Sequence, residues 1–181
     1  MSVSDNGTLS ATVSDTMYFY YISNRKYLFS HKFNDGKPTD MHISSDGKYL
    51  AVTLSYNEYN IYEIENNKCV YLAETGKYCY LLFDPEDSSK LLIQDDDSKT
   101  IKFLNLSPYS IIAEMETNEN IVSIDFYNNK FATRGNMSGS EYRLEGFELL
   151  KKVPVSNSVY ASFYKNDMIY MRYGIKFKLG N

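Results

Sequence analysis

Residues 45–83 read SDGKYLAVTLSYNEYNIYEIENNKCVYLAETGKYCYLLF, and this stretch decides the fold. It divides into four short runs that are rich in apolar and aromatic residues, and polar turn residues separate each run from the next. The runs are KYLAVT, YNIYEIE, CVYLAE and YCYLLF, and the turns fall at Asn57, Asn66-Asn67 and Thr75-Gly76. Four short strands joined by such turns predict an up-and-down antiparallel sheet.

The same pattern returns at a fixed step along the chain. A turn followed by a short apolar run begins at Asp5, Asp46 and Asp87, and weaker copies begin at Asn128 and Asn166, so the steps are 41, 41, 41 and 38 residues. A period of about 40–45 residues is typical of four-stranded propeller blades. We therefore expect repeat units at residues 5–45, 46–86, 87–127 and 128–165, with a partial unit at 166–181.

This periodicity predicts an all-β fold, a β-propeller that forms a single domain over residues 1–181. About four to five four-stranded antiparallel blades would build it. The 18 Tyr and 10 Phe residues favour strands, because flat aromatic side chains pack well on a pleated sheet. The segment 141–152 is the best helical candidate, yet its place in the repeat predicts a strand pair with a turn near Gly146.

The predicted ring is incomplete. If blade strands are named A (innermost) to D (outermost), the pattern begins with strand B near Leu9 and ends with strand C near Phe177, which gives roughly 18 strands, two fewer than five full blades. Unpaired strand edges invite pairing with another chain. Three outcomes stay open: a piece of a longer propeller, a homodimer through open sheet edges, or a small ring that closes with an imperfect last blade.

Charge and composition narrow the classes of partner. The chain has 19 Lys and Arg against 23 Asp and Glu, a net charge of −4, so we expect no nucleic-acid partner. No apolar run approaches the ~20 residues that cross a bilayer, so we expect no membrane insertion. The N-terminal residues MSVSDNGTLS do not resemble a signal peptide, which predicts a cytoplasmic location, or secretion if the chain is excised from a longer one.

Signals for catalysis are missing from the sequence. No nucleophile-elbow, zinc-protease, P-loop or dinucleotide-binding motif occurs, so we expect no enzyme activity and no cofactor. Cys69 and Cys79 do not form a metal or disulfide framework, and we expect free thiols. His31 and His42 fall in a predicted outer and a predicted inner strand, where we expect structural or surface roles, although Asp40 could orient His42.

The candidate binding residues lie in loops at one end of the predicted propeller, where the B–C and D–A connections open. Asp95, Asp96 and Asp97 form an acidic lip in one B–C turn, which would bind a cation or a basic peptide. The alternative is a solvated turn, in which Asp is favoured anyway. Tyrosine is enriched at interaction hot spots, although packing between blades also uses it. The same face is completed by Tyr56, Asn57, Tyr59 and Asn136.

Three stretches resemble WD-repeat propellers. SKTIKFLNLSPYSIIAEME (98–116) and YNIYEIENNKCVYLAE (59–74) are similar to the third and fourth strands of a WD repeat. SSDGKYLAV (44–52) resembles its second strand, and equally that of lactonase-type propellers. The Trp-Asp pair of the family is replaced by Tyr62-Glu63 and by Leu104-Asn105, and its Gly-His dipeptide is absent, so the buried network of that family is not carried over to any residue here.

The resemblance implies a non-enzymatic binding or scaffold module that holds a protein or peptide partner on one face of the ring. Fold alone does not fix function, so two alternatives remain. One is a lactonase-like propeller that binds a small ligand, a sugar or a metal in its central funnel. The other is a structural segment of a larger propeller.

Overall fold

The computed structural model describes most of the chain, and its described residues are 2–34, 36–54, 58–95, 97, 99–127, 129–136, 138–154, 160–164, 167–172 and 175–178. Within these ranges the backbone forms β-strands and one short 3-10 helix, η1 (Glu145–Phe147). In these same residues, no helix has the length and apolar character that crossing a membrane requires. The all-β class predicted by the repeat is confirmed.

The strands fall into four antiparallel sheets. The first sheet contains β1 (Ser2–Val3), β2 (Thr8–Val13), β3 (Thr16–Tyr21) and β4 (Lys26–Lys32). The second contains β5 (Asp40–Ile43), β6 (Tyr49–Thr53), β7 (Glu58–Glu65), β8 (Lys68–Phe83), β9 (Lys90–Asp95), β10 (Thr100–Leu106) and β11 (Tyr109–Glu116). The third contains β12 (Ile121–Tyr127), β13 (Lys130–Gly135), β14 (Ser138–Arg143) and β15 (Leu149–Pro154), and the last contains β16 (Tyr160–Tyr164), β17 (Asp167–Arg172) and β18 (Ile175–Lys178).

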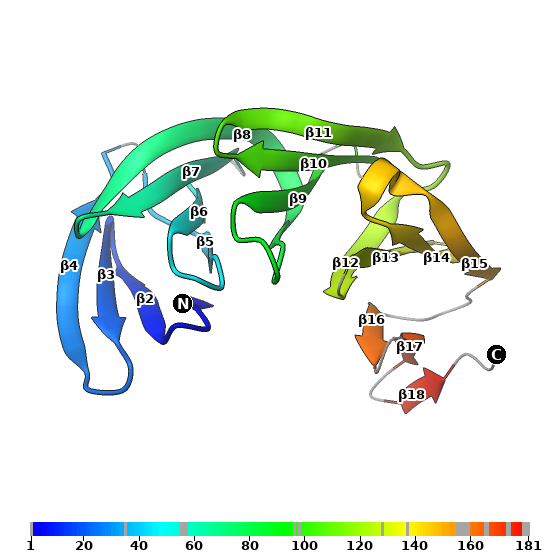
Figure 1. Ribbon diagram of the computed structural model, residues 1–181, viewed down its shortest axis with the longest axis horizontal. Coiled ribbons are helices and arrows are strands. Elements are labelled where there is room, and N and C mark those ends of the chain that lie inside the picture. The colour runs from blue at the N-terminus through cyan, green and yellow to red at the C-terminus, as the bar shows by residue number, and fades with distance from the viewer. Residues whose placement is uncertain are drawn as a thin grey trace.

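The seven-stranded sheet consists of two blades that share strand β8. Residues of β8 up to Lys77 pair with β7, and residues from Tyr78 onward pair with β9. The turn predicted at Thr75-Gly76 is therefore wrong, because the backbone there belongs to the extended strand β8, although its pairing with β7 shifts register between Glu74 and Lys77. A turn signal marks a reversal within one sheet, whereas β8 curves from one blade into the next (Figure 1).

The sheets thus correspond to five repeat units, which we number as blades. Blade 1 is β1–β4, blade 2 is β5–β7 with the first part of β8, blade 3 is the rest of β8 with β9–β11, blade 4 is β12–β15, and blade 5 is β16–β18. They follow one another along an arc, and the ring is not closed (Figure 1). The strand pair predicted over 141–152 is confirmed, with η1 between β14 and β15.

The first blade differs from the sequence prediction. An inner strand A was expected to be missing, but β1 pairs with β2 through Ser2 opposite Ser10 and Val3 opposite Leu9. This strand escapes a pattern search because two residues have no apolar periodicity, while pairing needs only backbone groups. In blade 5 the described residues form three strands, as expected for a blade without strand D.

Three apolar clusters fill the seams between consecutive blades. Successive residues of a strand face opposite seams, since side chains alternate across a sheet. Leu91 and Ile93 pack between blades 2 and 3, whereas Leu92, which lies between them in β9, packs between blades 3 and 4. The near-continuous apolar run in β9 is explained by these two seams.

The seam between blades 1 and 2 is rich in aromatic side chains. Phe19 and Phe29 stack with ring centroids 4.2 Å apart. His31 of β4 lies against the rings of Phe33 and Tyr62, at centroid distances of 4.7 and 5.4 Å. Cys69 packs at the edge of this seam as a free thiol, and its burial raises the pKa of the thiol to about 12. The side chain of Cys79 lies outside the described part.

Candidate functional site

The D–A and B–C connections lie on one side of the described blades and contact each other. Thr117, after strand β11, donates hydrogen bonds from its amide and its hydroxyl to the carbonyl of Lys99, each 3.0 Å long. Ser138, at the start of β14, donates from its amide and its hydroxyl to the Glu119 carboxylate. We call this surface the loop face. Its connections support one another because a D–A segment lies against a B–C turn in each case.

The first carboxylate of the predicted acidic lip is already paired. Asp95 ends β9, and its Oδ2 lies 2.6 Å from Nζ of Lys102 in the neighbouring strand β10. Both side chains are half-buried. The hydrogen bond to Asp95 raises the pKa of Lys102, so the lysine remains charged well above neutral pH. A cation at the lip would have to compete with this lysine for Asp95.

Asp97 holds its own turn together. Its Oδ1 accepts the backbone N–H groups of Lys99 and Thr100 at 2.7 and 2.8 Å, and its Oδ2 accepts the Thr100 hydroxyl at 2.7 Å. The N–H group of Thr100, and then that of Lys99, lowers the pKa of Asp97. This geometry favours the solvated-turn interpretation for Asp97, and Asp96 lies outside the described residues.

The remaining predicted site residues are not gathered in one place. Tyr59 was expected in a loop, but it lies in β7 with 4% of its surface exposed, because its ring packs in the seam between blades 2 and 3. Asn136 is exposed on the loop face directly after β13. Tyr56 and Asn57 lie outside the described residues.

Asp40, at the start of the inner strand β5, contacts the side chains of both His42 and Tyr59. Its Oδ2 lies 3.1 Å from Nε2 of His42 and accepts the Tyr59 hydroxyl at 3.2 Å. Burial acts to raise the pKa of Asp40, but the charge of His42 and hydrogen bonds from Met41, His42 and Tyr59 outweigh it, and the pKa is lowered. The sequence shows that Asp40 is close to His42, but no pattern in it indicates that Tyr59 is buried beside them.

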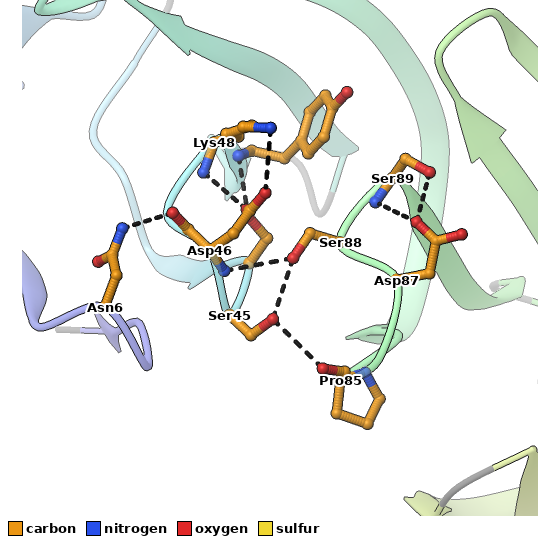
Figure 2. A network of polar contacts seen from close by, with 10 residues as sticks. Asn6, Ser45, Asp46, Lys48, Pro85, Asp87, Ser88 and Ser89 are labelled. Carbon is orange, nitrogen blue, oxygen red and sulfur yellow. Dashed lines mark hydrogen bonds and ion pairs between the residues drawn. The ribbon is translucent and has the colours of Figure 1, made fainter.

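The A–B turns on the opposite side of the blades form a continuous polar contact, which we call the turn tie (Figure 2). The amide of Asn6 donates to the carbonyl of Ser45 at 3.2 Å, and its side chain donates to the carbonyl of Asp46. Ser88 accepts the amide of Asp46 at 3.2 Å and lies 3.0 Å from the Ser45 hydroxyl. The turns that begin the first three repeat units therefore join blades 1, 2 and 3 through Asn6, Ser45, Asp46 and Ser88.

Metal ligands do not gather within the described ranges, where no group of three or more His, Cys, Asp or Glu side chains is placed to hold an ion. The described carboxylates of the loop face and the turn tie instead bind amides, hydroxyls and lysines, as Asp97, Asp46 and Asp95 do. The arrangement presents hydrogen-bonding groups on a stable surface.

Comparison with known proteins agrees with this geometry. No family model and no curated protein matches the sequence. Among solved structures, a chain in "Crystal Structure of Mitotic Checkpoint Complex" superposes with a TM-score of 0.67 at 12% identity. The protein described here therefore has a β-propeller fold. The match covers 98% of this propeller and 61% of the other chain, so the propeller spans less than two thirds of its length. The likeness supports the β-propeller fold that the sequence predicts.

Proposed function

We propose that this propeller is a non-enzymatic binding module that holds a protein or peptide partner on its loop face. The observation that carries the proposal is the mutual support of D–A and B–C connections, through Thr117 with Lys99 and Glu119 with Ser138. Loops held by a rigid scaffold are where binding usually occurs. The solved propeller that it resembles belongs to a protein complex, which agrees with a protein partner.

A photo-crosslinking amino acid at Asn136 tests this proposal. Asn136 is exposed on the loop face, and Glu65, exposed at the far end of β7, is the matched control position. We expect a discrete protein adduct from Asn136 in extracts of the source cells, and at least about tenfold less of it from Glu65. Equal labelling from both positions, or no adduct from Asn136, would contradict the loop-face assignment.

The acidic lip is tested separately with the triple variant Asp95→Asn, Asp96→Asn, Asp97→Asn. If the acidic lip contacts the partner, the yield of the crosslink from Asn136 falls in this variant. An unchanged crosslink yield would reject a role for the acidic lip but would leave the loop-face proposal standing. Because Asp95 and Asp97 also hold the B–C turn, thermal unfolding of the variant is measured in parallel. Metal analysis of the purified protein addresses the rival lactonase-like reading, since a stoichiometric ion would overturn the non-enzymatic proposal.

A further inference from the structure

A groove of about 560 Å³ lies between blades 3 and 4, on the side of the A–B turns and away from the loop face. Its walls come from the A–B turn of blade 3, strands β10 and β11, and the segment around η1 in blade 4. The volume is in the range of known ligand sites. None of the residues predicted for the loop face lines it, so this is a separate site.

One wall of the groove is acidic. Asp84 is only 6% exposed, and its Oδ1 accepts the amides of Glu86 at 2.9 Å and Asp87 at 3.3 Å. No cationic side chain in the described part of the chain pairs with Asp84 or Glu86, whereas Asp87 is paired with Lys90 at 3.0 Å. The attraction between a carboxylate and a cation is stronger where little water screens it. The wall therefore favours a positively charged group.

The floor of the groove is apolar. Phe103 and Leu144 are buried, and Ile112 of the outer strand β11 is 49% exposed. Phe103 pairs with Ala113 and the next residue of β10 pairs with Ile111, so Ile112 is an extra residue without a partner in the ladder. Such a bulge redirects a side chain, and here an isoleucine at the groove is left accessible. Ile112 thus gives the groove an apolar side chain that a partner can contact.

We propose that this groove binds an extended peptide segment of a partner protein in which a lysine or arginine stands close to a large apolar side chain. The cation contacts Asp84 and Glu86, and the apolar side chain lies on Ile112, Phe103 and Leu144. Charge complementarity selects this occupant over a second copy of the chain, whose net charge of −4 opposes approach to an acidic wall. The proposal shares the binding function argued above and adds a second surface to it.

Labelled nonapeptides and the whole chain test the proposal by fluorescence polarisation. The peptides have a Gly-Ser scaffold that carries one Arg and one Leu at one-, two- or three-residue spacing. Matched peptides replace Arg by Glu, or Leu by Ser. We expect at least one Arg/Leu peptide to bind with a dissociation constant below about 1 mM, and each matched peptide to bind at least about tenfold more weakly.

The protein variants separate the groove from its surroundings. Glu86→Lys and Ile112→Ser should weaken binding about tenfold or more. Ile111→Ser is the matched control, since Ile111 is 55% exposed beside Ile112 but does not line the groove. Glu65→Lys controls for the change of charge. All four positions are exposed, so the variants should fold, and circular dichroism checks this.

Several results would overturn the groove assignment: no binding up to 1 mM, equal binding of the Glu peptide, or equal losses in Ile111→Ser and Ile112→Ser. A fall in solution mass on Glu86→Lys would show that a second copy fills the groove and would also overturn it. If Asn136 gives no crosslink but the Arg/Leu peptide binds, only the loop-face proposal is rejected. If Asn136 gives a crosslink but no peptide binds, only the groove proposal is rejected.

Discussion

The surroundings of several side chains in this propeller are set by packing between blades. His31 shows the effect, because it lies in an outer strand yet touches Phe33 and Tyr62 in the seam between blades 1 and 2. Burial lowers its pKa below the ordinary value of 6.5. The neutral ring is therefore the form that the folded seam accepts.

We expect His31 to make the free energy of unfolding depend on pH. The unfolded chain binds a proton at His31 near pH 6.5 while the folded chain does not, so its contribution is present above that pH. Stability is lost as the pH falls through 6.5 toward the lower folded pKa. Urea unfolding at pH 7.5 and pH 5.5 measures this loss, which should be smaller in His31→Gln. An identical loss in the variant and the wild type would exclude His31 as the cause.

At the scale of elements, the A–B turns do more than reverse the chain. Asp46 closes its own turn by accepting the Lys48 amide at 3.0 Å and the Ser44 hydroxyl at 2.8 Å, and the same turn contacts Asn6 and Ser88 of the two neighbouring blades. The Asp-Gly signal in the sequence thus marks both a local turn and a contact between blades.

Gly47 is the position where this double role can be tested. It has a φ of +76°, and a Cβ there would lie 2.6 Å from Nδ2 of Asn6. Gly47→Ala should lower the free energy of unfolding by about 2 kcal/mol, from backbone strain plus a disturbed hydrogen bond. Gly146→Ala is the control, because Gly146 has a φ of +71° with nothing within 4 Å, and should cost about 1 kcal/mol. If chemical unfolding gives the same loss of unfolding free energy for Gly47→Ala and Gly146→Ala, the turn tie does not contribute to stability.

At the scale of the whole molecule, one flank of blade 1 has no other described sheet beside it in the arc (Figure 1). Tyr20 and Tyr27 pair across β3 and β4, with ring centroids 5.7 Å apart, on the face opposite the Phe19 and Phe29 stack. Tyr27 and Val3 are each 49% exposed. The equivalent faces of blades 2, 3 and 4 pack in seams, whereas this flank of blade 1 exposes tyrosine and valine side chains.

We expect two copies of the chain to associate through this flank. Light scattering should give twice the mass of one chain, and Tyr27→Glu should return it to the mass of a monomer by placing a charge on an apolar contact. Lys26→Glu, next to it in β4, is the control for the added negative charge and should leave the dimer intact. A monomer at high protein concentration in the wild type would contradict the prediction.

Most of the strand order could be predicted from the sequence because it depends on local signals. Turn residues at a 41-residue step and alternating strands are properties of short segments, and they located the blades. The continuation of β8 through Gly76 could not be predicted, since it depends on partners in two different blades. The two-residue strand β1 was missed because it is too short to show a period.

The candidate site was less predictable than the fold. Asp95 and Asp97 were recognised as an acidic turn, but their partners Lys102 and Thr100 follow from the register and the turn geometry, which charge alone does not reveal. Tyr59 was predicted to lie in a binding loop because it follows a turn signal, whereas its ring packs in the seam between blades 2 and 3. The bulge at Ile112 needs the pairing of two strands to be seen.

The shared strand β8 has a consequence for how the arc comes apart. Blades 1 and 4 join their neighbours through connections between separate sheets, whereas blades 2 and 3 are joined by the single strand β8, whose first part pairs with β7 and whose second part pairs with β9. We expect fraying at either end to stop at a sheet boundary, whereas β8 keeps blades 2 and 3 connected by extended backbone. We therefore expect the outer blades to open more readily than blades 2 and 3.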